Sequence, residues 1–253
     1  MSIHEEIRDQ QKKLKDMTFK EKLSYFWDYY KVHTIVTLVV VIVGGVFIHD
    51  AVTAKDHAFS AILLNSFGSD SQEMLETEFA GYANIDLNTY DCYIDTASTL
   101  SYDSMSQMDL AVSQKITAMS QTDGLDVLIS DTAPFTNFAE GMMFVDLREE
   151  LTAAEYEKYE PYFFYIDAAA LDSDDELVYD ENGMPVVTDE SIDHSDPSAM
   201  ADPIPVGIYL KDSPKLAGYQ CYVTDEIPPV LGFVYSSEKK ENSHLFLQYL
   251  MEE

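Results

Sequence analysis

Polar side chains stand directly after two short apolar segments, where a binding site is expected. The two segments, 58–64 and 125–129, have the length and apolar content of buried strands. The candidate ligand-binding residues that follow them are Asn65, Ser66, Phe67, Asp131 and Thr132. Parallel strands would bring both sets to one edge of a sheet, outside the carboxyl ends, where open α/β sheets bind ligands. The second set also stands at a predicted helix start, whose free N–H groups can face a ligand. The same residue types form turns and helix caps, so that role stays open.

The chain lacks the residue spacings that mark common active sites. It contains no GxSxG, HExxH or P-loop spacing and no glycine-rich nucleotide loop. Its six histidines are separate from one another in the sequence: His4, His33, His49, His57, His194 and His244. We therefore predict no catalytic residue, no cofactor and no enzyme. A hydrolase of envelope sugars that uses two paired acids stays open, because such pairing depends on the fold.

An acidic segment raises the question of a calcium site. Residues 159–210 contain 13 Asp plus Glu and no Lys or Arg. The sequence DENG at 180–183 resembles the middle of a calcium loop, but Val178 stands where the first ligand belongs. The match to a calcium loop therefore fails, and a β-hairpin turn within 176–187 explains Gly183 better. We predict no metal site, although the acidic residues 172–176 could hold a cation loosely.

The two cysteines, Cys92 and Cys221, are far apart in the sequence. They are too few for an all-cysteine zinc site or for a disulfide scaffold. Outside a cell they could pair. Cys92 alternates with Tyr90 and Ile94 along a predicted strand, which favours a buried thiol. The sequence leaves both alternatives open.

Strand and helix patterns alternate through the segment that carries the candidate residues. Strands are expected at 58–64, 89–94 and 125–129, each followed by a helical pattern. Such an order predicts an α/β domain with a parallel sheet and right-handed crossovers. Further strands are expected at 143–147, 204–210 and 229–235, and a final helix after Ser237. Thr152 and Glu155 have the spacing of a capping box, which predicts a short helix there.

One apolar run near the N-terminus has the length of a membrane span. Lys31 and Asp50 enclose 18 residues without a charged side chain. As a helix they would extend about 27 Å, close to the roughly 30 Å hydrocarbon core of a bilayer. We predict a single transmembrane helix at 32–50. A buried core helix and a cleaved signal peptide, with Val52-Thr53-Ala54 as cleavage site, are the alternatives.

Basic residues indicate the orientation of this span. Seven of the 15 Lys plus Arg come before the run, and only Lys55 follows it closely. The positive-inside rule places the N-terminus in the cytoplasm and the C-terminal domain outside. Phe19, Phe26 and Tyr30 share one face of a preceding helix, which we expect to lie along the inner leaflet. A partner helix would suit that face equally well.

Charge limits the partners of the remaining chain. The segment after the run carries 40 acidic and 8 basic residues, a formal charge of −32. Such a surface repels nucleic acid, so we predict no nucleic-acid partner. The content of aromatic and aliphatic residues is that of a folded protein. We therefore divide the chain into a cytoplasmic tail and juxtamembrane helix (1–31), a span (32–50), a linker (51–56) and an α/β domain (57–253) with an acidic insertion at 159–202.

Three longer segments form a recognisable order along the chain: GLDVLISDTAPFTNFAEGMMFVDLREEL at 124–151, PIPVGIYLKDSP at 203–214 and VLGFVYSSEKKENSHLFLQYL at 230–250. Together they resemble parts of bacterial extracellular solute-binding proteins, of the type II periplasmic-binding-like class. In the third segment the resemblance lies in a helical face formed by Asn242, Phe246 and Leu250. The resemblance implies the fold of one lobe. Members of that class usually have a second lobe between the third strand and the hinge, where an acidic, loop-rich segment of about 50 residues stands here.

Together these features predict a location more directly than a reaction. We expect a single-pass membrane protein of a bacterial cell envelope, anchored in the lipid bilayer through 32–50. Its extracellular domain would act as a non-enzymatic binding or interaction module for an envelope protein or a small molecule. The alternative is a solute receptor that delivers a small ligand to a transporter.

Overall fold

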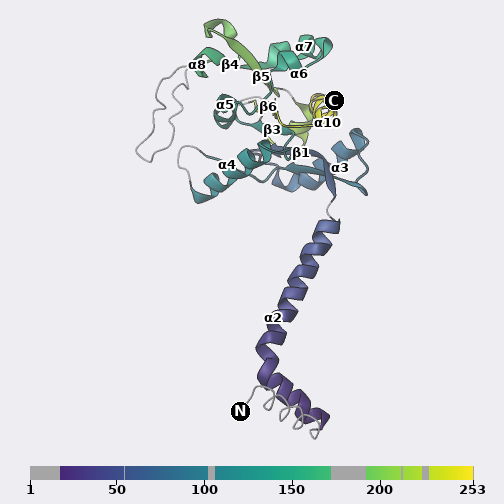
Figure 1. Ribbon diagram of the computed structural model, residues 1–253. Helices are drawn as coiled ribbons and strands as arrows, with labels where there is room; N and C mark the ends of the chain where they lie inside the picture. The colour runs from purple at the N-terminus through teal and green to yellow at the C-terminus, as the bar shows by residue number, and fades with distance from the viewer. Residues whose placement is uncertain are drawn as a thin grey trace. The chain divides into compact units, whose positions relative to one another are not determined.

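The computed structural model describes residues 18–53, 55–101, 106–171, 192–211, 213–223 and 228–252 (Figure 1). Contacts divide the chain into two compact units, 1–54 and 55–253, and each is described by itself below. The hairpin expected at 176–187 and the acidic residues 172–176 lie outside the described residues.

The first unit contains one long helix, α2 (Phe19–Thr53), of 35 residues. Its window Tyr30–His49 is long and apolar enough to cross a membrane, and none of it is buried. The interpretation of this apolar run as a buried core helix is therefore wrong. The expected juxtamembrane helix and span form one element, which changes direction in its first part (Figure 1). The linker is shorter than expected, because α2 continues to Thr53 and the first strand begins at Asp56.

The second unit is built on a six-stranded sheet with the order β2-β1-β3-β6-β5-β4. Three strands are parallel, as expected: β1 (Asp56–Leu63), β2 (Tyr90–Asp95) and β3 (Val127–Ser130). The other three run antiparallel to their neighbours: β4 (Phe163–Asp167), β5 (Pro203–Tyr209) and β6 (Val230–Phe233). The expectation of a purely parallel sheet is wrong, and the domain is α/β with a mixed sheet. Apolar periodicity reports burial and not strand direction, which explains the error.

Eight helices are described in the second unit. They are α3 (Gln72–Tyr82), α4 (Gln107–Ser120), α5 (Thr132–Glu140), α6 (Leu147–Glu150), α7 (Ala153–Tyr159), α8 (Ala168–Leu171), α9 (Pro214–Gly218) and α10 (Lys240–Met251). Short 3-10 turns add η1 (Ser69–Ser71), η2 (Glu160–Tyr162) and η3 (Pro197–Ala199). The capping box predicted from Thr152 and Glu155 is present at the start of α7. The strand expected at 143–147 is wrong: only a single bridge joins Phe144 to Val234, because α6 begins at Leu147.

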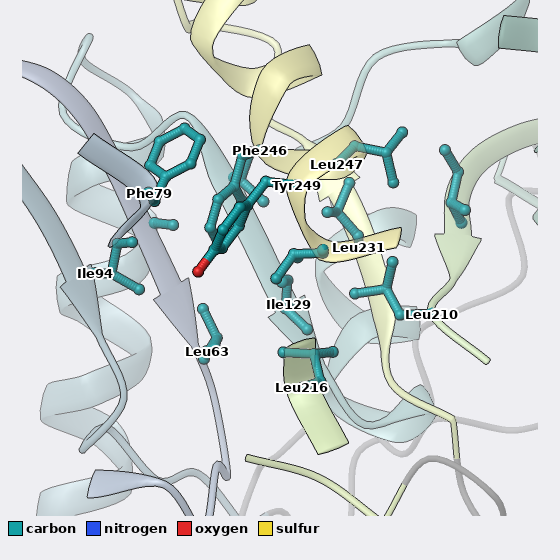
Figure 2. Packing of buried hydrophobic residues seen from close by; sticks show 14 of the residues in the cluster. Leu63, Phe79, Ile94, Ile129, Leu210, Leu216, Leu231, Phe246, Leu247 and Tyr249 are labelled. Atoms are coloured by element: carbon teal, nitrogen blue, oxygen red, sulfur yellow. The ribbon is translucent and has the colours of Figure 1, made fainter. Parts of the chain in front are cut away.

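Helices cover both faces of the sheet, which makes three layers (Figure 1). On one face, α3, α9 and α10 pack around Phe79, Leu216 and Phe246 (Figure 2). On the other face, α4 and α5 contribute residues such as Ile116 and Phe135. Because both faces are covered, β1 is buried without alternation from Phe59 to its end. This continuous burial explains why the segment 58–64 consists almost entirely of apolar residues, without the polar alternation of a half-buried strand.

β6 contains a glycine at its centre that allows a close contact with an aromatic ring. A Cβ atom on Gly232 would lie 2.5 Å from Cδ1 of Phe144. The ring of Phe144 in turn stacks on Phe135, with centroids 4.4 Å apart and planes at 6°. Gly232 therefore lets α5 and the segment before α6 pack directly on the sheet.

Candidate functional site

A cleft of about 400 Å³ opens at the carboxyl ends of the three parallel strands. The loops after β1 and β2 and the first turns of α4 and α5 all contribute to it. Its walls are formed by Asn65, Thr99, Leu100, Ser101, Asp109, Asp131, Ala133 and Pro134. Two of the five residues predicted from the sequence, Asn65 and Asp131, therefore line a cleft at the predicted edge of the sheet.

Asn65 joins all three loops of this edge. Its Nδ2 donates to the carbonyl oxygen of Leu100 at 3.0 Å and to Oδ2 of Asp131 at 3.1 Å, and its Oδ1 accepts from Leu100 N at 2.8 Å. Its backbone has a positive φ of 61°, a conformation that Asn tolerates better than most residues. Both polar groups of the side chain are thus engaged. Asn65 shapes the cleft by holding the loop after β2 against the loop after β3.

Asp131 occupies the N-cap position of α5 without capping it. Its side chain accepts no hydrogen bond from the helix backbone, unlike Asp146, which accepts from Arg148 N at the start of α6. Oδ2 accepts from Asn65, while Oδ1 has no hydrogen-bond partner among the described residues. Burial raises the pKa of this carboxyl, and the hydrogen bond from Asn65 opposes that rise. Asp131 therefore contributes a partly buried carboxylate to the lining of the cleft.

The other three predicted residues do not line the cleft. Ser66 Oγ accepts from Gly68 N at 3.0 Å and stabilises a turn. Phe67 is 75% exposed, and its backbone N donates to the carbonyl oxygen of Cys221 at 2.8 Å. The carbonyl oxygen of Thr132 accepts from Thr136 Oγ1 at 2.8 Å inside α5. Their contacts are those of turn and helix residues, the alternative that the sequence left open.

One wall of the cleft depends on an ion pair that the sequence did not reveal. Asp95, at the end of β2, lies 2.5 Å from Lys115 Nζ of α4, and its side chain is only 5% exposed. The carboxylate also accepts from Ser98 Oγ at 2.6 Å and from the backbone N of Ala97 and Ser98. Burial would raise the pKa of Asp95, but these hydrogen bonds and Lys115 outweigh it and hold the pKa below its usual value. The pair fixes the start of the loop that continues to Leu100.

Asp95→Asn is expected to lower the stability of the α/β unit at pH 7 by about 1–3 kcal/mol, because it weakens several hydrogen bonds to a charged group. The folded pKa of Asp95 is lowered, so the stabilisation is present above the unfolded value of about 3.9 and is lost as pH falls through the folded value. Urea unfolding of the full chain in detergent between pH 2.5 and 7 measures this.

The difference between the wild type and Asp95→Asn should therefore shrink below about pH 4. Asp202→Asn removes the same charge from an exposed residue and serves as the control, with little change in stability at any pH. A stability difference for Asp95→Asn that stays constant over the whole pH range would contradict the assigned ion pair.

A second polar cluster joins α10 to α6 and α7. His244 lies between two carboxylates, with Nδ1 3.0 Å from Glu155 Oε1 and Nε2 3.3 Å from Glu150 Oε1. Lys240 Nζ lies 2.5 Å from the other oxygen of Glu150, and the His244 ring stacks on Phe233 with centroids 5.1 Å apart. About 90 residues separate the partners in the sequence, so sequence reasoning treated His244 as isolated. Because both ring nitrogens face carboxylates, the cluster fastens helices and presents no free ring nitrogen to a substrate.

The two cysteines are free and buried, 2% and 0% exposed for Cys92 and Cys221. Burial raises the pKa of both thiols, for Cys92 to about 12. Both belong to the core cluster under α3 and α10. Of the two alternatives left open by the sequence, a disulfide and buried free thiols, the structure has the buried free thiols. Among the residues that the structure describes, no group of three His, Cys, Asp or Glu side chains is arranged to hold a metal ion.

The chain was also compared with known proteins. No family model, no curated protein and no solved structure matches it.

Proposed function

We propose that this chain is a single-pass membrane protein whose α/β unit is an extracytoplasmic, non-enzymatic binding or interaction module of a bacterial cell envelope. In this proposal the unit corresponds to one lobe of the solute-binding class that three of its segments resemble. The observation that carries the proposal is the apolar window Tyr30–His49. It contains no buried residue, while residues 55–253 form a compact unit with their own core.

Exposed apolar surface of this extent favours a bilayer over water. Leu, Ile, Val and Phe each contribute about −0.3 to −0.6 kcal/mol to insertion when they lie near the centre of a span. The side chains from Ile35 to Ile48 are mostly of these types and are exposed. Lys20 and Lys31 precede them and Lys55 follows. The greater number of basic residues before the window supports a cytoplasmic N-terminus.

The cleft supports the binding part of the proposal. Its volume of about 400 Å³ lies within the range of about 300–1,000 Å³ that is typical of small-molecule sites. The polar groups around it are mostly engaged in holding loops: Asn65 binds Leu100, and Asp109 caps α4 together with Ser106. This arrangement supports recognition rather than a reaction. The cleft also supports the alternative of a solute receptor for a transporter.

Cysteine labelling on intact cells tests the topology. The native Cys92 and Cys221 are buried and their thiols have raised pKa values, so background labelling by a membrane-impermeant maleimide should be low. Ser198→Cys places a thiol at an exposed position of the α/β unit, and Ser2→Cys places one before the span. Ser198→Cys should react on intact cells, and Ser2→Cys only after lysis.

The unchanged chain, with its two buried thiols, is the control for both variants. Labelling of Ser2→Cys on intact cells, with protection of Ser198→Cys until lysis, would show that the orientation is reversed. Recovery of the chain in the soluble fraction, cut after Ala54, would show that the apolar helix is a cleaved signal sequence. Either result overturns the proposed anchoring.

A further inference from the structure

The cleft at the carboxyl ends of β1, β2 and β3 contains a carboxylate that the described residues leave without a counter-charge. Asp95 is paired with Lys115, and Asp126 accepts from Ser60 N and Ser237 Oγ. Asp131 accepts one hydrogen bond, from the neutral amide of Asn65, and no described Lys, Arg or His forms an ion pair with it. Of these three partly or fully buried carboxylates, only Asp131 lines the cleft, and its Oδ1 has no hydrogen-bond partner among the described residues.

Burial of such a group is unfavourable. Asp131 is partly buried, so its carboxylate loses part of its hydration, and one neutral hydrogen bond replaces that loss incompletely. The raised pKa of Asp131, caused by burial, reports the same imbalance. A cationic group in the cleft would replace the lost hydration with a charge-assisted hydrogen bond.

The walls of the cleft define the kind of cation. Leu100, Ala133 and Pro134 supply apolar surface beside Asp131. Asp109 adds a second carboxylate, whose oxygens accept from Ser101 N and Ser106 N and so stay fixed in place. Apolar walls with a carboxylate at one end suit an ammonium or guanidinium group on a short aliphatic body. A hydrated metal ion would gain nothing from the apolar walls.

We propose that this cleft binds a small organic cation, with its ammonium or guanidinium group against Asp131 and its aliphatic part against Leu100, Ala133 and Pro134. The inference rests on the proposed function of the α/β unit as a binding module and names its ligand class. The high negative charge of the segment after the span, −32, raises the local concentration of cations and favours their entry.

Three probes of equal length test the charge preference: n-pentylammonium, pentan-1-ol and pentanoate. Binding is measured by calorimetry and ligand-observed NMR with the full chain in nanodiscs of zwitterionic lipid, which does not attract cations by itself. Pentylammonium should bind at least tenfold more tightly than the alcohol and the acid. Asp131→Asn should weaken pentylammonium binding at least tenfold. Asp202→Asn, which removes the same charge from an exposed position of the same unit, should weaken it less than twofold.

A second pair of variants leaves Asp131 and its bond to Asn65 intact. Ala133 is exposed on the cleft wall, so Ala133→Lys places an ammonium group within reach of Asp131, and Ala133→Gln adds similar bulk without charge. The lysine variant should abolish pentylammonium binding, and the glutamine variant should retain most of it. Equal loss in both variants would show that bulk and not charge matters, and would overturn the inference.

The remaining outcomes also decide the question. Binding of pentylammonium to Asp131→Asn as tight as to the wild type, or equal binding of all three probes, would overturn the cation assignment. If the alcohol or the acid binds and the ammonium does not, the cation assignment is wrong while the binding module stands. The topology is tested independently by the labelling of Ser198→Cys and Ser2→Cys.

Discussion

Phe246→Ala is expected to lower the free energy of unfolding of the α/β unit by about 3–5 kcal/mol, the usual cost of deleting a fully buried aromatic side chain. Phe246 of α10 has no exposed surface, and its ring lies 4.8 Å from the rings of both Phe59 and Phe79. Figure 2 shows Phe79 and Phe246 close together beside Tyr249. The three phenylalanine rings connect α10, β1 and α3, so the cavity would lie where three elements meet.

Urea unfolding followed by the near-ultraviolet circular dichroism of the tyrosines measures this loss. Tryptophan fluorescence would not report it, because the only Trp, Trp27, belongs to α2. Phe246→Leu keeps most of the volume and should cost roughly 1.5 kcal/mol or less. Met108→Ala removes a side chain that is 70% exposed and should change stability by less than about 0.5 kcal/mol. A loss below about 1 kcal/mol for Phe246→Ala would contradict the packing around this ring.

Asp126→Ala is expected to cost about 2–4 kcal/mol, because two buried donors would lose their acceptor. Asp126 is wholly buried just before β3, and its carboxylate accepts from Ser60 N at 2.7 Å and from Ser237 Oγ at 2.5 Å. Its backbone continues the connection, since Val234 N donates to its carbonyl oxygen at 3.0 Å. One residue thus joins β1, the start of β3 and the chain that follows β6.

A double-mutant cycle separates this bridge from a general effect on the core. Ser237→Ala removes one of the two donors, so Asp126→Ala combined with Ser237→Ala should cost less than the sum of the two single variants. Asp126→Asn keeps an acceptor of the same shape and should be milder than Asp126→Ala. Strict additivity of the two single variants would show that the side chains of Asp126 and Ser237 do not act together. Chemical denaturation of the full chain in detergent supplies all four values.

The amino-acid sequence by itself determined the features that depend on local pattern. The exposed apolar helix, the three parallel strands and the capping box of Thr152 and Glu155 are all present where they were predicted. The helical face of Asn242, Phe246 and Leu250 does face the sheet: two of these side chains are fully buried, and Asn242 Nδ2 donates to the carbonyl oxygen of Ala58. These features were readable because periodicity and capping act within a few residues of the chain.

The tertiary structure alone decided which distant residues meet. Asn65 reaches Asp131 across 66 positions, and Asp95 meets Lys115 across 20. His244 meets Glu150 and Glu155 across about 90 positions. β4 lies within the segment 159–202 that was expected to be an acidic insertion, and the direction of β5 and β6 was not visible in their apolar content. Such contacts depend on strand order and helix packing, which are properties of the whole sheet and leave no local pattern in the sequence. The edge of the sheet that carries the cleft was predictable, because it follows from where the first and third strands end in the sequence. The unpaired carboxylate of Asp131 was visible only in the folded structure, because it depends on which distant side chains lie beside it.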